Sequence, residues 1–191
     1  MKELNKSHLF GISLFTLFGF SGIAYFILHF SDQYDYADLF EDLLASESIF
    51  YGLAVGLLIS GLGFAFLQLN YFKEVNNYFG TIFKSFDLEW SDVFFYSFCA
   101  AVGEEILFRG AIQPFLGIYP TAFIFVLLHG YLSFKDKPKF TYGIYLIGVA
   151  VVFGYLMEKF GIIAPIIAHF IYDVVMFAWL KQKNKSESDG I

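Results

Sequence analysis

Six ionisable side chains stand inside long apolar stretches of this 191-residue chain, all in its C-terminal half: Glu104, Glu105, Arg109, His129, His169 and Asp173. Placing such a group at mid-membrane costs about 3 kcal/mol on insertion scales, so it usually serves a function. A carboxylate beside imidazoles in apolar surroundings can act as a general base toward water, and a nearby donor can hold an oxyanion. These are the two requirements of amide hydrolysis.

Helical spacing sorts these residues into pairs. Glu105 and Arg109 are four residues apart with the acid first, which favours an ion pair on one helix face. His169 and Asp173 have the same spacing, so Asp173 could accept the Nδ1 proton of His169 and fix its tautomer. Glu104 points about 100° away from Glu105. Its partners must come from other helices, and His129 and the imidazole at 169 are the candidates.

The composition indicates which elements must position these groups. The chain is 58% hydrophobic, 22% aromatic and only 16% charged, which excludes a disordered chain. A net charge of -6 would repel phosphates, so nucleic acid is excluded as a partner. A single cysteine excludes a disulfide scaffold and a cysteine-rich metal site. The remaining class is an integral membrane protein.

A membrane-spanning helix needs about 20 apolar residues to cross about 30 Å of hydrocarbon. We expect six such spans, at 8–30, 49–72, 93–116, 120–134, 141–157 and 163–180. The sequence therefore predicts an all-α protein with a single membrane domain over residues 1–191. At 1.5 Å per residue, Glu104 and His169 lie at a common depth of roughly 16 Å from the inner ends of their spans, and His129 is shallower.

Lysine placement predicts the orientation, because basic loops stay in the cytoplasm. Ten of the 12 basic residues fall on one side of the six spans: Lys2, Lys6, Lys73, Lys84, Lys135, Lys137, Lys139, Lys181, Lys183 and Lys185. Both termini are then cytoplasmic, and the acidic segment 32–47 is external, where it could form a short amphipathic surface helix. We expect a flexible tail over 181–191. The small residues Gly52, Gly56 and Ser60, and likewise Ala150 and Gly154, favour close packing of helices within the bundle.

Three short segments carry a resemblance to a known family. They are Glu104-Glu105-Ile-Leu-Phe-Arg109, Phe125-Val-Leu-Leu-His129 and His169-Phe-Ile-Tyr-Asp173. In order and spacing they are similar to the E-E-x-x-x-R, F-x-x-x-H and H-x-x-x-N/D motifs of the CPBP family (CAAX proteases and bacteriocin-processing enzymes, also called ABI). These are intramembrane glutamic proteases. The resemblance covers about 93–180 and none of the first two spans.

The resemblance implies hydrolysis of a peptide bond without a metal or other cofactor. Glu104 with His129 would activate the attacking water, and His169 with Asp173 would stabilise the oxyanion. Glu105 and Arg109 would support the site structurally. The site would then lie in the last four helices, within a core at 90–180, and residues 1–89 would add two peripheral helices and the acidic external loop. The expected partners are a membrane-associated peptide or protein substrate and the lipid bilayer, which the resemblance suggests is a bacterial cytoplasmic membrane.

Asp173 departs from part of the family pattern. The eukaryotic prenyl-protein enzymes have Asn in the third motif. Asn can donate a hydrogen bond to an oxyanion, whereas an ionised Asp cannot and would repel it. Asp173 must therefore be protonated or serve to orient His169.

Two other functions fit the same residues. Glu104, His129, His169 and Asp173 are all possible zinc ligands, so a zinc-dependent membrane protease is one alternative, which a chelator would inhibit. A non-catalytic scaffold or bacteriocin-immunity protein that keeps the family fold is the other. A biological effect that survives Glu104→Gln would favour this second alternative.

Overall fold

The computed structural model describes residues 6–41, 45–86 and 88–188, and within them every regular element is a helix. In chain order these are α1 (Lys6–Leu14), the π-helical η1 (Phe15–Gly19), α2 (Phe20–His29), the 3-10 helix η2 (Ala37–Phe40), α3 (Ser46–Gln68), the 3-10 helix η3 (Asn70–Phe72), α4 (Lys73–Ser85), α5 (Trp90–Glu105), the π-helical η4 (Ile106–Ile112), α6 (Gln113–Leu116), α7 (Ile118–Leu128), α8 (Lys137–Phe160) and α9 (Ile163–Ser188). The all-α class is confirmed.

Four helical runs in the described residues are long and apolar enough to cross a membrane: Lys6–His29, Ser46–Gln68, Lys137–Phe160 and Ile163–Gln182. They correspond to the first, second, fifth and sixth predicted spans. The third predicted span is the uninterrupted run of α5, η4 and α6, which carries Glu104, Glu105 and Arg109. The fourth is α7, an apolar helix of 11 residues. The count of six crossings stays a prediction.

Several boundaries differ from those expected. The helix α7 ends at Leu128 and not at Phe134, because Gly130 adopts a positive φ of 72° that turns the chain away. The sequence predicted a connection at 73–89, where the structure has the amphipathic helix α4. The described residues of the acidic segment, 32–41 and 45–47, contain the short η2 and the start of α3. The expected surface helix also includes residues 42–44, which lie outside the described ones. At the other end α9 continues to Ser188, and the flexibility of 181–191 stays a prediction.

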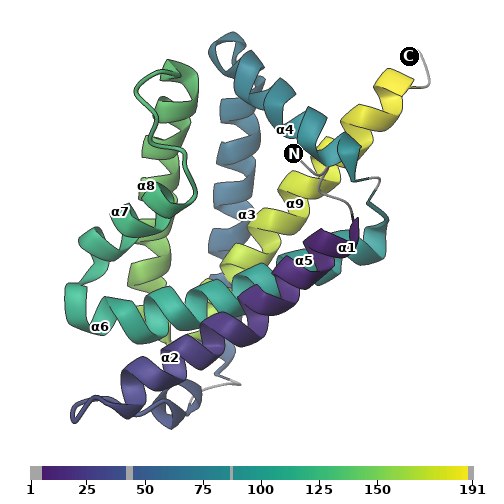
Figure 1. Cartoon of the computed structure of the whole chain (residues 1–191). Coiled ribbons are helices and arrows are strands. Elements are labelled where there is room, and N and C mark those ends of the chain that lie inside the picture. The colour runs from purple at the N-terminus through teal and green to yellow at the C-terminus, as the bar shows by residue number, and fades with distance from the viewer. Residues whose placement is uncertain (1–5, 42–44, 87, 189–191) are drawn as a thin grey trace.

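The helix α9 lies at the centre of the bundle, in contact with α3, α4, α5 and α8 (Figure 1). Small residues allow α3 to approach it closely. A Cβ added to Gly52 would lie 2.8 Å from the Ala164 carbonyl oxygen, and one on Gly56 would lie 2.9 Å from the Cα of Ala168. Gly154 on α8 meets Ile118 of α7 in the same way. The expected use of these stripes for packing within the bundle is confirmed.

The N-terminal helical run lies along α5 (Figure 1) and fixes the segment that carries Glu104. A Cβ on Gly103 would lie 2.0 Å from the Thr16 carbonyl oxygen, so only glycine permits this backbone contact. At the other end of α5, Lys6 Nζ lies 2.6 Å from a carboxylate oxygen of Asp92. The residues next to the proposed base are therefore held by an element outside the motif-bearing half.

Candidate active site

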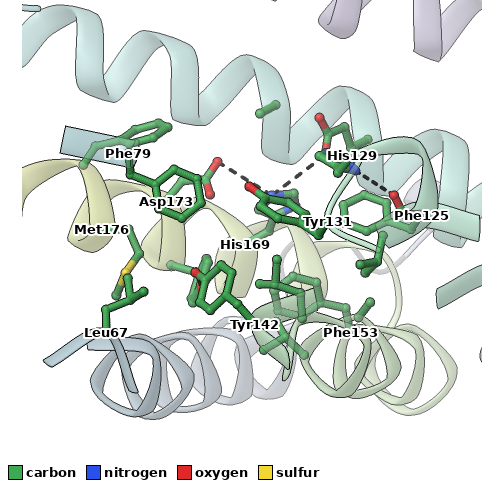
Figure 2. Close-up of a pocket in the computed structure, with 18 of the residues that line it drawn as sticks. Leu67, Phe79, Phe125, His129, Tyr131, Tyr142, Phe153, His169, Asp173 and Met176 are labelled. Carbon is green, nitrogen blue, oxygen red and sulfur yellow. Dashed lines mark hydrogen bonds and ion pairs between the residues drawn. The ribbon is translucent and has the colours of Figure 1, made fainter. Parts of the chain in front are cut away.

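A cavity of about 290 Å³ lies between α3, α4, α5, α7, α8 and α9 (Figure 2). All four predicted catalytic side chains line it: Glu104, His129, His169 and Asp173. Most of the remaining lining is apolar or aromatic, with Phe125, Phe153 and Met176 among its members. The sequence prediction that these four residues come together from three helical regions is confirmed by the geometry, whereas their catalytic roles stay predictions.

Glu104 lies between the two imidazoles. Its Oε2 is 3.6 Å from His129 Nε2 and 4.0 Å from His169 Nε2. The side chain is 14% exposed, so it opens to the cavity while most of it is buried. Both distances are too long for direct hydrogen bonds, and each contact becomes an ion pair only when its imidazole is protonated. Such contacts are often loose without substrate and shorten in the reacting complex.

The orientation of His129 follows from the end of α7. The residue is the C-cap of that helix, and its Nδ1–H donates to the Phe125 carbonyl oxygen at 2.7 Å. Because a carbonyl can only accept, Nδ1 carries the proton and a neutral ring presents a bare Nε2 to Glu104. The early end of α7 thus places His129 beside the Glu104 carboxylate, at the end of its helix and not within a longer span.

His169 is oriented by Glu105 and not by Asp173, contrary to the sequence expectation. Its Nδ1 donates to Glu105 Oε1 at 2.9 Å, whereas Asp173 Oδ2 lies 3.6 Å from Nε2. The helical spacing correctly put Asp173 on the same face of α9, but the crossing of α5 over α9 decides which acid meets Nδ1. The Phe153 ring stacks on the imidazole with centroids 5.4 Å apart.

The predicted pair of Glu105 and Arg109 is confirmed. Arg109 Nε lies 3.0 Å from Glu105 Oε2, and both side chains are fully buried. The contact is an ion pair without hydrogen-bond alignment, and the other guanidinium nitrogens bond to no described residue. The guanidinium carbon lies 5.2 Å from the centre of the Phe125 ring. Arg109, Glu105 and His169 therefore form a buried chain that joins η4 to α9.

Some lining residues escaped the sequence analysis. Phe79 comes from the unexpected α4, and Tyr131 comes from a segment that was assigned to the fourth span. The glycine at 130 and the polar residues after it were the available signal that a loop begins there. Among the described residues, no group of three His, Cys, Asp or Glu side chains is arranged as a metal site.

Comparisons with known proteins agree with the motifs. Residues 85–175 match the model of a family described as Type II CAAX prenyl endopeptidase Rce1-like. The chain is 32% identical over 84 residues to the "Uncharacterized protein YpbD" of Bacillus subtilis (strain 168), a match that covers 44% of this chain and 42% of that relative. The chain thus spans less than half the length of the curated relative that it matches. No solved structure matches it significantly. The resemblance to the CPBP family is confirmed over 85–175.

Proposed function

We propose that this protein is an intramembrane endopeptidase in which water activated by Glu104 hydrolyses a peptide bond without a metal ion. The observation that carries this proposal is the position of the Glu104 carboxylate, 3.6 and 4.0 Å from two imidazoles in one largely apolar cavity. The match to an Rce1-like protease family supports the same reaction class. The four long apolar helices support a location in the membrane.

The reaction begins when Glu104 takes a proton from water as the water oxygen bonds to the scissile carbonyl carbon. The electron pair of the C=O bond moves to the oxygen and forms an oxyanion. When the oxyanion collapses, the C–N bond breaks, and the proton held by Glu104 passes to the departing amine. His129 holds the water through its bare Nε2, since its Nδ1–H is engaged with Phe125.

His169 and Asp173 face the oxyanion side of the site. The His169 Nε2 points into the cavity because Glu105 engages Nδ1. Asp173, 3.6 Å from that Nε2, favours a proton there, and a protonated Nε2 donates to the oxyanion. In this arrangement Glu105 orients the imidazole, and Asp173 favours its charged form and has no need to contact the oxyanion. The substitution of Asp for Asn in the third motif is then compatible with hydrolysis.

The substrate that fits this site is a membrane-associated peptide or protein segment in extended form. Besides its ionisable groups, the cavity is lined by apolar side chains from α3, α8 and α9, including Leu67, Val149 and Met176. An extended segment exposes its amide to the base, whereas a helical segment hides it. No cofactor takes part.

The proposed topology has six crossings with both termini in the cytoplasm. Figure 1 supports it, since α4, the α7–α8 connection and the end of α9 lie at one end of the bundle and the α2–α3 connection lies at the other. In a Cys99→Ala background, we expect a membrane-impermeant maleimide to label Asp32→Cys in intact cells. Lys135→Cys should react only after permeabilisation. Both positions are exposed, and the reverse pattern would contradict this orientation.

The function is tested by comparing new peptide termini by mass spectrometry in membranes with wild-type protein or Glu104→Gln at matched expression. We expect cleavage products that appear only with the wild type and persist when a zinc chelator is added. Products that disappear with the chelator would favour the zinc enzyme. Identical termini, together with a phenotype rescued equally by both forms, would favour a scaffold or immunity protein.

A further inference from the structure

The cluster of four ionisable residues supplies few hydrogen-bond donors for an oxyanion. His169 Nδ1–H is engaged by Glu105, and Asp173 has no proton to donate when it is ionised. Negative charge that develops on the carbonyl oxygen would also lie near the carboxylates of Glu104 and Asp173. A neutral donor in the same cavity would stabilise that charge without adding another titrating group.

Tyr131 is placed to supply this donor. It follows the turn at Gly130, lines the cavity beside Glu104 and Asp173, and has its ring nearly parallel to the His129 imidazole, with 6.3 Å between centroids and 9° between planes. Figure 2 shows its hydroxyl directed toward the His169 and Asp173 pair. The phenol therefore lies on the oxyanion side of the site, opposite the carbonyl that fixes His129.

The hydroxyl of Tyr131 is also uncommitted. No hydrogen bond joins it to any other residue in the described part of the chain. The two other phenols in the cavity, Tyr142 and Tyr172, are hydrogen-bonded to each other at 2.9 Å. An O–H group that lines a cavity without a protein partner is free to donate to a bound substrate.

A positive charge lies beside this phenol. Lys139 Nζ is 6.0 Å from the centre of the Tyr131 ring and 5.0 Å from that of Tyr78. A cation stabilises negative charge that develops near it. The backbone N–H of Lys139 donates to Asp136 at the start of α8, which fixes this residue relative to the site.

We propose that Tyr131 is a further catalytic residue, whose hydroxyl donates a hydrogen bond to the oxyanion formed during peptide hydrolysis. This inference rests on the proposed function. The Tyr131 proton stays on the phenol throughout: the C=O electron pair moves to the carbonyl oxygen as water adds, the O–H···O⁻ bond strengthens, and the pair returns when the C–N bond breaks. The stabilisation is thus confined to the transition state and intermediate.

The test uses the purified full-length protein in detergent micelles and a mixture of internally quenched peptides with apolar central residues. The variant Tyr131→Phe removes only the hydroxyl and keeps the ring beside His129. Tyr145→Phe is the matched control, because its hydroxyl donates to the Ile59 carbonyl outside the cavity lining. Initial rates over a range of peptide concentrations separate kcat from KM, and thermal unfolding checks that each variant is folded.

We expect Tyr131→Phe to lower kcat by about 10²-fold with KM changed by less than a factor of three, as for the loss of one oxyanion donor. Tyr145→Phe should keep the wild-type kcat. A Tyr131→Phe enzyme with wild-type kcat, while Glu104→Gln is inactive, would overturn this inference and leave the proposed function intact. A wild-type protein that cleaves no peptide would overturn both.

Discussion

Replacing Glu104 with glutamine is expected to reduce peptide hydrolysis by about 10²–10⁴-fold, the usual contribution of a general base. This corresponds to about 3–5 kcal/mol of transition-state stabilisation. The glutamine keeps the size of the side chain and its place between His129 and His169 but cannot take a proton from water. Since the loss occurs at the proton-transfer step, kcat should fall and KM should change little.

A graded series makes this prediction specific to the base. Glu104→Asp keeps the carboxylate but withdraws it from imidazoles that are already 3.6 and 4.0 Å away, so its rate should lie between those of wild type and Glu104→Gln. Glu158→Gln changes an exposed glutamate near the end of α8 and should leave the rate unchanged. The rates are measured on the purified protein with the peptide identified by mass spectrometry. Equal activity of Glu104→Gln and Glu158→Gln would exclude Glu104 as the base.

The long apolar spans and the charged residues within them could be predicted from the sequence because hydrocarbon sets strict limits on both. A helix such as Ser46–Gln68 must be about as long as the membrane is thick, and a carboxylate such as Glu104 must find partners inside the bundle. The pairing of Glu105 with Arg109 depends only on spacing within one helix, so it too was predictable.

Features that depend on how separate helices cross could not be predicted. Whether His169 Nδ1 meets Glu105 or Asp173 is decided by the angle between α5 and α9, and the sequence contains no local sign of that angle. The helix α4 was missed because it is neither long nor uniformly apolar, and it is stabilised by contacts such as that of the buried Val75 with the bundle. The position of Tyr131 follows from the end of α7 at Leu128.

Replacing Arg109 with leucine is expected to cause the largest loss of stability, about 3–5 kcal/mol, because it leaves the fully buried Glu105 carboxylate without its cation. For a chain of this size such a loss lowers the midpoint of thermal unfolding by about 6–20 °C. The matched control Lys159→Leu removes an exposed cation at the end of α8 and should shift the midpoint by no more than about 2 °C. Thermal unfolding of the purified variants in one detergent provides the comparison.

The double variant Glu105→Leu with Arg109→Leu separates stability from orientation of the site. With both charges removed, no buried ion is left unpaired, so the double variant should recover much of the midpoint lost in Arg109→Leu. It should still hydrolyse peptide poorly, since His169 Nδ1 loses its acceptor and the ring is free to turn away from Glu104 and Asp173. Recovery of full activity together with stability would show that Asp173 alone orients His169. A double variant less stable than Arg109→Leu would show instead that the ion pair itself stabilises the bundle.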